Sequence, residues 1–334
     1  MNKYQKYTVK ISLIVALGGF LMGFDASVIS GVVKFIEPEF GLTKLELGWA
    51  VSSLTLTSTL AMMLAGPLAA AFGRRPVLML AACLYAISAI GSALAPGFIT
   101  LVIARMIGGF GVGASLIIAP MYIAEISPPK IRGRMVSFNQ LNIVIGISVA
   151  FFTNYLILQL SQSESSWVKT LAIDVHQWRW MLGLEALPAV MYFGFLLIVP
   201  ESPRWLIMKG REEKALNILN RVSAQQQATQ IISDVKAGIS KERKKKKVTF
   251  TELFKPALRL VLTIGIVVAV LQQITGINSV FFYAPMIFEQ AGLGVDAAFS
   301  QAIYVGLTNL IFTIVALSLI DKIGRKLLLI IGVS

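Results

Sequence analysis

The sequence predicts an all-α polytopic membrane protein. Three observations support this prediction: the composition, the length of the apolar segments and the placement of the charges. Of 334 residues, 56% are hydrophobic and only 14% are charged, and mean hydropathy is +0.76. A composition this apolar is typical of chains that cross a bilayer several times.

Eight apolar segments are long enough for a helix to cross about 30 Å of hydrocarbon. They cover roughly residues 11–33, 47–72, 76–95, 98–124, 136–160, 179–199, 258–288 and 297–320, and a ninth begins at Leu327. Three regions follow: a six-helix N-terminal bundle at 1–200, a cytosolic linker with amphipathic helices at 201–257, and a partial C-terminal bundle at 258–334.

The basic residues predict the orientation of these segments. With a cytosolic N-terminus, 25 of the 30 Lys and Arg residues fall on the inside, and Arg105 lies within a span. Only Lys34, Lys44, Lys169 and Arg179 fall outside. This imbalance follows the positive-inside rule and explains the net charge of +13 without nucleic acid. We expect an integral protein of a bacterial inner membrane.

The first span contains GGFLMGFDASVISG at 18–31, in which Asp25 is the only charge between Ile11 and Val33. A carboxylate at this depth costs at least about 2.5 kcal/mol, so it should face the protein interior and have a partner. Such a residue is a candidate functional group. The alternative is a protonated carboxyl that hydrogen-bonds a neighbouring helix.

The fourth span supplies a cation for Asp25. Arg105 would otherwise be unpaired in a low dielectric, so we expect a direct or water-bridged pair with Asp25. Pairing favours the charged carboxylate, whereas apolar surroundings favour the acid, so alternate exposure would load and unload a proton. The following GGFGVG is no nucleotide loop, because no strand precedes it; Gly109 and Gly113 instead indicate close helix packing.

The linker begins with a helix start, because Ser202 is a suitable N-cap and Pro203 suits the first helical position. Further on, four apolar residues follow the spacing i, i+3, i+4, i+7, which predicts a short amphipathic helix on the cytosolic face. They are Ala215, Ile218, Leu219 and Val222.

The seventh span carries polar groups that suit a neutral, hydroxyl-rich ligand. On a continuous helix, four of its residues would share one face: Gln272, Gly276, Ser279 and Tyr283. Side-chain amides both donate and accept hydrogen bonds, which matches sugar hydroxyls. The alternative is that Gln and Asn here join helices to one another.

Gly276 and Pro285 indicate that this helix is broken or loosened. On a continuous helix, Asn278 would point about 140° away from Gln273. A break between them would turn both amides toward one cavity.

The chain also contains an internal repeat. FGRRP at 72–76 follows the Asp25 motif in the first half, and IGRKL at 323–327 follows QQITGINSVFFYAP in the second. Two similar halves joined by a linker are typical of secondary transporters. A full repeat would hold about four further spans, so the second half is expected to be truncated.

Together these motifs resemble the sugar porter family of the major facilitator superfamily. They are GGFLMGFDASVISG, RMIGGFGVG, PMYIAEISPPKIRGRMVSFNQ, PESPRWL, QQITGIN and DKIGRK, and the resemblance covers essentially the whole chain. It implies rocker-switch alternating access and a sugar or polyol substrate. The acid and the arginine of proton-coupled members correspond to Asp25 and Arg105.

The resemblance further implies sugar-binding amides at Gln272, Gln273, Asn278 and Asn309. It also assigns nine charged residues to a cytosolic gate. They are Arg74, Arg75, Glu125, Arg132, Glu201, Arg204, Asp321, Arg325 and Lys326. Exposed ion pairs are worth only about 0 to 1 kcal/mol, so such a network would bias one state against another. The alternative is that these charges only set the topology.

The chain departs from the family pattern at two places within the first half. Ala70 stands where the family usually has Asp, and the neighbourhood of Ile147 and Ser148 replaces an expected glutamine. The first change removes an acceptor from the gate, and the second removes one sugar contact. The tenth span, which supplies further sugar contacts in the family, is also missing.

We therefore favour a proton-coupled sugar transporter whose partners are the sugar, a proton and the lipid bilayer. A facilitative transporter, and a truncated membrane sensor or scaffold, are the alternatives. We expect no enzyme, because no nucleophile and base stand together, and no cofactor, because no metal-ligand cluster or phosphate loop is present. The single histidine, His176, falls in an outside loop. The oligomeric state and the choice of sugar stay open.

Overall fold

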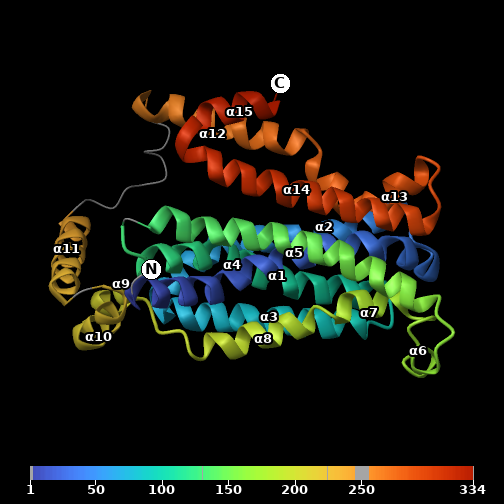
Figure 1. Cartoon of the computed structure of the whole chain (residues 1–334), viewed down its shortest axis with the longest axis horizontal. Helices are drawn as coiled ribbons and strands as arrows, with labels where there is room; N and C mark the ends of the chain where they lie inside the picture. The colour runs from blue at the N-terminus through green and yellow to red at the C-terminus, as the bar shows by residue number, and fades with distance from the viewer. Residues whose placement is uncertain (1–2, 130, 224, 245–255, 334) are drawn as a thin grey trace.

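The computed structural model describes residues 3–129, 131–223, 225–244 and 256–333, and all regular elements in these ranges are helices (Figure 1). The N-terminal half comprises α1 (Lys3–Phe40), α2 (Lys44–Phe72), α3 (Arg74–Ala93), α4 (Phe98–Ile126), α5 (Arg132–Ser161), α6 (Ser166–Thr170), α7 (Gln177–Gly183) and α8 (Ala186–Leu196). Among the described residues, seven helical stretches are long and apolar enough to cross a membrane.

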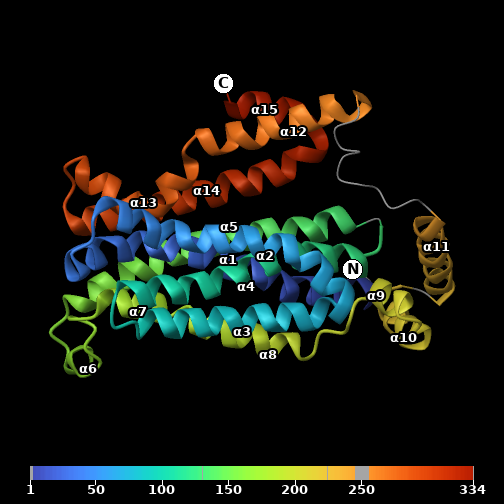
Figure 2. The same ribbon diagram turned by 180° about the vertical axis from the view of Figure 1, so that it is seen from behind.

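The long helices of this half form one bundle (Figures 1 and 2). Helix α1 packs against α5, α4 packs against α2 and α3, and α3 also packs against α8. Large apolar side chains such as Leu21, Leu78 and Leu101 are fully buried between them. The helix ends follow local signals: Thr43 and Glu46 form a capping box before α2, and Gly73 at φ 110° separates α2 from α3.

The sixth expected span is broken into two helices. Between α7 and α8, Leu184 and Glu185 form a turn within the apolar segment 179–199. Pro188, in the first turn of α8, explains this break because it has no N–H to donate and its ring clashes with the carbonyl four residues earlier. The span therefore exists, but as a pair of short helices.

Glycines allow the backbones of α2 and α4 to approach closely, as the sequence predicts for Gly109 and Gly113. A Cβ built on Gly109 would lie 2.4 Å from the carbonyl oxygen of Leu54. One built on Gly113 would lie 2.1 Å from the carbonyl oxygen of Ser58. Any side chain at these positions would force the two helices apart.

The linker holds α9 (Pro203–Met208), α10 (Glu212–Val222) and α11 (Gln225–Lys244), and its residues 245–255 lie outside the described residues. Ser202 caps α9 as expected, because its hydroxyl accepts a hydrogen bond from the amide of Trp205 at 3.3 Å. The predicted amphipathic helix is α10, which buries Ala215, Leu219 and Val222. It packs against α9 and the start of α1.

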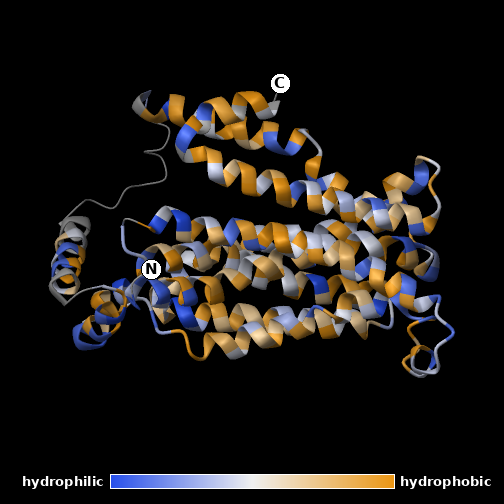
Figure 3. Cartoon of the chain, viewed as in Figure 1, coloured by the Kyte–Doolittle hydropathy of each residue, from blue (hydrophilic) through white to orange (hydrophobic). Residues whose placement is uncertain are grey.

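The C-terminal half comprises α12 (Pro256–Ile274), α13 (Ile277–Gln290), α14 (Val295–Ile323) and α15 (Arg325–Val333). Helix α13 packs against α1 and α14 packs against α5, whereas α12 and α15 stand apart from the N-terminal helices in both views (Figures 1 and 2). Apolar residues cover much of these C-terminal helices (Figure 3). The two halves therefore meet from the end farther from the N-terminus to about the middle of α5 and α14.

The close packing of α2 and α4 predicts that a larger residue at the helix crossing lowers the stability of the folded protein. Gly113→Ala should lower the free energy of unfolding by about 1–3 kcal/mol, because its methyl group overpacks a tight helix crossing. The matched control is Gly194→Ala on α8, where an added Cβ meets nothing within 4 Å. That control should be neutral or stabilising by up to about 1 kcal/mol. Thermal unfolding in detergent measures both, and equal melting temperatures for the two variants would contradict the prediction.

Candidate functional site

A buried ion pair lies inside the N-terminal bundle. Arg105 Nη1 on α4 lies 3.3 Å from Asp25 Oδ1 on α1, and both side chains are only 2% exposed. Arg105 Nε also donates a hydrogen bond to the backbone carbonyl of Ala50 on α2, at 3.2 Å. The contact expected from the sequence is therefore present and direct. It ties three helices together inside the bundle.

A glycine on α4 makes room for the carboxylate. A Cβ built on Gly108 would lie 3.2 Å from Asp25 Oδ2 and 2.4 Å from the hydroxyl of Ser88 on α3. The side chains of Asp25 and Ser88 thus converge on the bare backbone of α4, one turn beyond Arg105. Any larger residue at position 108 would displace one of them.

A second buried carboxyl, Glu185, lies at the break between α7 and α8, and the sequence analysis missed it. Its side chain is buried, and its charge interacts with those of Asp25 and Arg105. Glu185 is therefore an ionisable residue within an apolar segment in addition to Asp25 and Arg105. The signal was available, because a single carboxylate in the apolar segment 179–199 meets the criterion that selected Asp25.

Two of these carboxyl oxygens lack a hydrogen-bond partner within the described part of the chain. They are Asp25 Oδ2 and Glu185 Oε1, and the nearby hydroxyl of Tyr85 on α3 is also unpaired there. Leaving a buried polar atom unpaired costs about 1–3 kcal/mol, and more for a charged group. The two carboxyl oxygens are therefore available to accept a proton or a hydrogen bond from a bound water.

The helix break predicted in the seventh span brings its two amides together. Gly276 adopts φ 73°, which separates α12 from α13, and Asn278 Nδ2 donates a hydrogen bond to Gln273 Oε1 at 2.9 Å. A second irregularity at Tyr283, with φ −127° and ψ 19°, precedes Pro285. Both amides are exposed, so in this structure they do not join packed helices.

The other expected sugar-binding residues occupy varied surroundings. Gln272 is exposed on the last turn of α12, and Tyr283 is half-buried where α13 packs against the N-terminal bundle. Asn309 is half-buried on α14, one turn after Gly306. The structure brings Gln273 and Asn278 into contact, but it shows no direct contact that joins Gln272, Tyr283 and Asn309 to them.

Ile147 and Ser148, which replace an expected glutamine, contact the C-terminal half. The hydroxyl of Ser148 donates a hydrogen bond to the backbone carbonyl of Gly306 at 2.9 Å. Ile147 packs against the small cluster formed by Phe151, Ala284 and Ala302. These two positions therefore serve helix packing between α5 and α14.

Four of the expected gate residues gather at the N-terminal end of the bundle. We call them, together with Ser202, the arginine cluster: Arg74, Arg75, Glu125, Glu201 and Ser202. Arg74 Nε and Nη2 form a two-pronged ion pair with Glu125, with both distances at 2.9 Å. The Ser202 hydroxyl donates to the same carboxylate at 2.5 Å. The cluster therefore joins α3, α4 and the start of α9.

Glu201 receives backbone amides in this cluster. Its carboxylate accepts hydrogen bonds from the N–H groups of Arg74 at 3.0 Å and Ser202 at 2.7 Å. Burial raises the pKa of the Glu201 carboxyl, although these amides and the charge of Arg74 act in the opposite direction. The arginine beside it, Arg75, donates to the carbonyls of Leu196 at 3.0 Å and Leu197 at 2.8 Å.

The remaining gate residues are not part of the arginine cluster. Arg132 and Arg204 are exposed, at the first turns of α5 and α9, and Lys326 is exposed on α15. Asp321 and Arg325 lie in described helices, but their side chains lie outside what the structure describes. Ala70 contributes its backbone carbonyl, which accepts a hydrogen bond from Trp205 Nε1 at 3.1 Å.

Polar contacts join the two halves at the opposite end of the bundle. Lys34 Nζ on α1 lies 2.8 Å from both carboxylate oxygens of Glu289 on α13. Gln162, just after α5, donates a hydrogen bond to Asp296 on α14 at 2.8 Å. We refer to these two contacts as the interhalf contacts. They were not anticipated from the sequence, because they join residues more than 130 positions apart.

The described residues include no group of three or more His, Cys, Asp or Glu placed to hold a metal ion. What the site offers is a buried set of one cation and two carboxyls, and a pair of exposed amides at a helix break. The first is suited to binding and releasing protons, and the second to hydrogen-bonding a neutral ligand.

Comparisons with known proteins agree with this chemistry. The sequence model of the family described as "Sugar (and other) transporter" matches residues 11–334. The arabinose-proton symporter of Bacillus subtilis (strain 168) is 40% identical over 327 residues, which are 98% of this chain and 68% of that protein. The D-xylose-proton symporter of Escherichia coli (strain K12) is 38% identical and aligns with 98% of this chain and 69% of its own length.

A solved structure resembles the whole described fold. The partially occluded inward-open conformation of the xylose transporter XylE from E. coli superposes with a TM-score of 0.83 at 35% identity. The alignment covers 98% of this chain and 76% of that one. This chain thus spans about two thirds of the length of its curated relatives. It belongs to the sugar transporter family within the major facilitator superfamily, as an integral membrane transporter rather than an enzyme.

Proposed function

We propose that this chain carries the proton-coupling and part of the sugar-binding machinery of a proton-driven monosaccharide symporter. We place it in a bacterial inner membrane with its N-terminus in the cytosol, in accordance with the positive-inside rule. Relatives named as arabinose-proton and D-xylose-proton symporters support a pentose as the first substrate to test. The observation that carries the proposal is the buried contact between Asp25 and Arg105.

The charge balance of the buried set supports proton coupling. Arg105 neutralises one carboxylate, but Asp25 and Glu185 both lie within reach of its charge. If both carboxyls were ionised, Asp25, Glu185 and Arg105 together would carry a net charge of −1 in a low dielectric. Binding one proton removes that net charge. Because Asp25 keeps one unpaired oxygen, it can take up that proton without first leaving Arg105. In this mechanism protonation weakens the ion pair and so shifts the balance between the states in which the two halves rock against each other.

Contacts between the halves support alternating access. The interhalf contacts hold the outer end together, while α12 and α15 stand away from the N-terminal helices (Figure 2). With a cytosolic N-terminus, this arrangement is open toward the cytosol. The interhalf contacts are partly exposed, so each contributes only about 0 to 1 kcal/mol, enough to bias the states but weak enough to reverse.

The arginine cluster supports a role at the cytosolic gate. Its buried two-pronged pair between Arg74 and Glu125 fixes the ends of α3 and α4, so the cluster would move as one body with the N-terminal half. Gate closure would then require groups from the C-terminal half to reach this surface. We assign that part to the turn between α14 and α15, where three further gate residues lie: Asp321, Arg325 and Lys326.

The first prediction concerns coupling. Asp25→Asn should abolish sugar accumulation driven by an inward proton gradient, because an amide cannot exchange a proton, while sugar exchange without a gradient persists. The measurement is uptake of labelled arabinose and xylose into proteoliposomes. The control is Asp234→Asn, an exposed aspartate on α11. Full accumulation in Asp25→Asn would overturn the role given to Asp25 and favour a facilitative transporter.

The second prediction concerns the substrate. Removing either amide should weaken sugar binding by about 1–3 kcal/mol, because sugar hydroxyls lose a partner that both donates and accepts. We expect this for Gln273→Ala and for Asn278→Ala, measured by titration calorimetry with D-xylose. Gln290→Ala, at an exposed position at the end of α13, should leave the affinity unchanged. If Gln273→Ala and Asn278→Ala bind xylose like the control, the two amides do not contact the sugar.

The third prediction concerns pH. Because the folded protein raises the pKa of Glu201, the folded state binds that proton more tightly than the unfolded state does. The stabilisation linked to Glu201 is then full below the unfolded pKa and decreases as pH rises through the folded pKa. The melting temperature of wild type should therefore fall relative to Glu201→Gln as pH rises above about 4, the ordinary pKa of a glutamate. The exposed control Glu213→Gln should track wild type, and a relative gain by wild type would contradict the assignment.

A further inference from the structure

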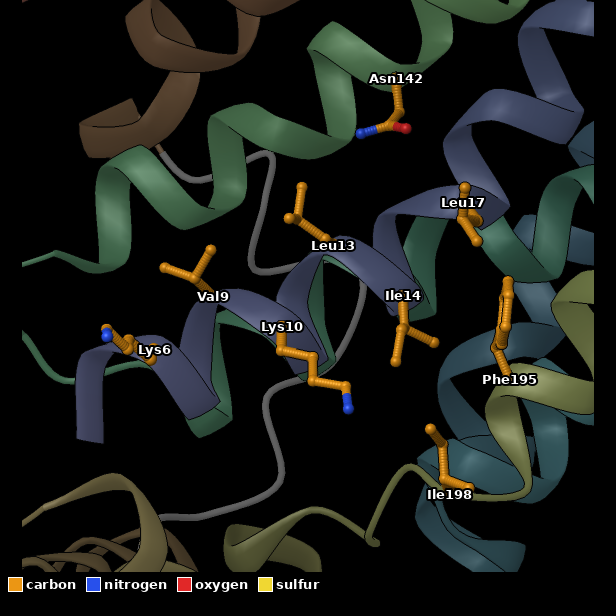
Figure 4. A pocket seen from close by; sticks show the side chains of 9 residues that line it. All are labelled: Lys6, Val9, Lys10, Leu13, Ile14, Leu17, Asn142, Phe195 and Ile198. Carbon is orange, nitrogen blue, oxygen red and sulfur yellow. The ribbon is translucent and has the colours of Figure 1, made fainter. Parts of the chain in front are cut away.

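An apolar groove runs along the cytosolic half of α1, between α5 and α8 (Figure 4). Leu13, Leu17, Phe195 and Ile198 supply apolar walls, and Lys6 and Lys10 lie toward the N-terminal end. This open groove has a volume of about 670 Å³, which is within the range of about 300–1,000 Å³ found for small-molecule sites. It shares no lining residue with the ion pair, the amides or the arginine cluster.

The groove opens on the outer surface of the bundle rather than into its core. Leu13 is 44% exposed and Ile198 is 59% exposed, although both belong to apolar membrane segments. In a bilayer such side chains contact lipid. A concave apolar surface at this depth therefore suits an acyl chain.

Two cations lie at one end of this apolar surface. Lys6 and Lys10 are one helical turn apart, and neither forms an ion pair or hydrogen bond with any residue that the structure describes. The groove lining contains no acidic residue. Basic pockets between membrane helices on the cytosolic side are suited to anionic lipid headgroups.

The distance between the cations and the far end of the groove matches one leaflet. Lys6 and Leu17 are eleven residues apart on a helix, which corresponds to about 16 Å. Half of a hydrocarbon core of about 30 Å is about 15 Å. A lipid whose phosphate contacts the lysines would therefore lay its acyl chain along the whole apolar wall.

We propose that this groove is a binding site for one anionic phospholipid, with its phosphate at Lys6 and Lys10 and an acyl chain along Leu13 and Leu17. The occupant is a lipid rather than a free phosphate, because most of the lining is apolar. Assigning the lipid to the cytosolic leaflet rests on the orientation proposed above. Since α1 also carries Asp25, a lipid held here would brace the helix that contributes to the proton site.

The test is lipid binding by native mass spectrometry, with delipidated protein titrated with phosphatidylglycerol or phosphatidylcholine of identical acyl chains. Wild type should prefer phosphatidylglycerol. The double variant Lys6→Gln/Lys10→Gln should bind phosphatidylglycerol about tenfold to thirtyfold more weakly. Phosphatidylcholine should lose much less affinity, because its choline ammonium already balances the charge of its phosphate. The matched control Lys209→Gln/Lys214→Gln, which removes two exposed lysines of the linker, should keep the preference.

A second pair of variants tests the apolar wall without changing charge. Leu13→Trp should fill the groove and weaken binding of both lipids, whereas Leu80→Trp, at an exposed position on α3, should not. Equal binding of the two lipids by wild type, an unchanged preference in Lys6→Gln/Lys10→Gln, or full displacement by inorganic phosphate would each overturn the proposal. Binding in detergent requires neither orientation nor transport, so its outcome is independent of whether symport itself is observed.

Discussion

The contact between Asp25 and Arg105 constrains the rest of the N-terminal bundle. Two opposite charges with 2% exposure each are tolerable in a low dielectric only when they meet at short range, so α1 and α4 have to lie side by side at this depth. Arg105 extends the constraint to α2 through the carbonyl of Ala50. The bare backbone at Gly108, Gly109 and Gly113 then permits the close approach that this geometry requires. The buried charge and the glycines on α4 thus act together, because the glycines allow the close helix packing that the buried ion pair needs.

The two halves differ in how much of their apolar surface is buried among their own helices. The N-terminal half buries its large apolar side chains among its own helices, and the arginine cluster secures one end of it. Helices α12 and α14 instead expose leucine, isoleucine and valine along much of their length, and they join the first half through α13 and α14. The N-terminal half meets the second half through reversible polar contacts and one small apolar cluster around Phe151, so the two can rock against each other. This asymmetry is the structural basis for proposing alternating access.

Much of the fold could be predicted from sequence because membrane constraints act locally. Span lengths follow from the bilayer thickness, and the break at Gly276 follows from the conformational freedom of glycine. The partner of Asp25 was predictable because a buried charge leaves few alternatives. The contact of Lys34 with Glu289 was not, because the two residues lie 255 positions apart and exposed charges have many possible partners. Glu185 could have been predicted too, because it is a carboxylate within an apolar segment, as Asp25 is. The break beside it was also indicated, by Pro188.

Both interruptions of membrane helices coincide with polar residues of the candidate site. Glu185 lies where α7 gives way to α8, and the bond between Gln273 and Asn278 crosses the gap between α12 and α13. Non-helical backbone at membrane depth leaves carbonyl and amide groups unpaired, so it is tolerated only where protein or a water-filled cavity surrounds it. A break therefore costs stability, and here each break coincides with a polar side chain of the candidate site. On a continuous helix the amides of Gln273 and Asn278 would diverge, and the break is what lets them form one hydrogen-bonding surface.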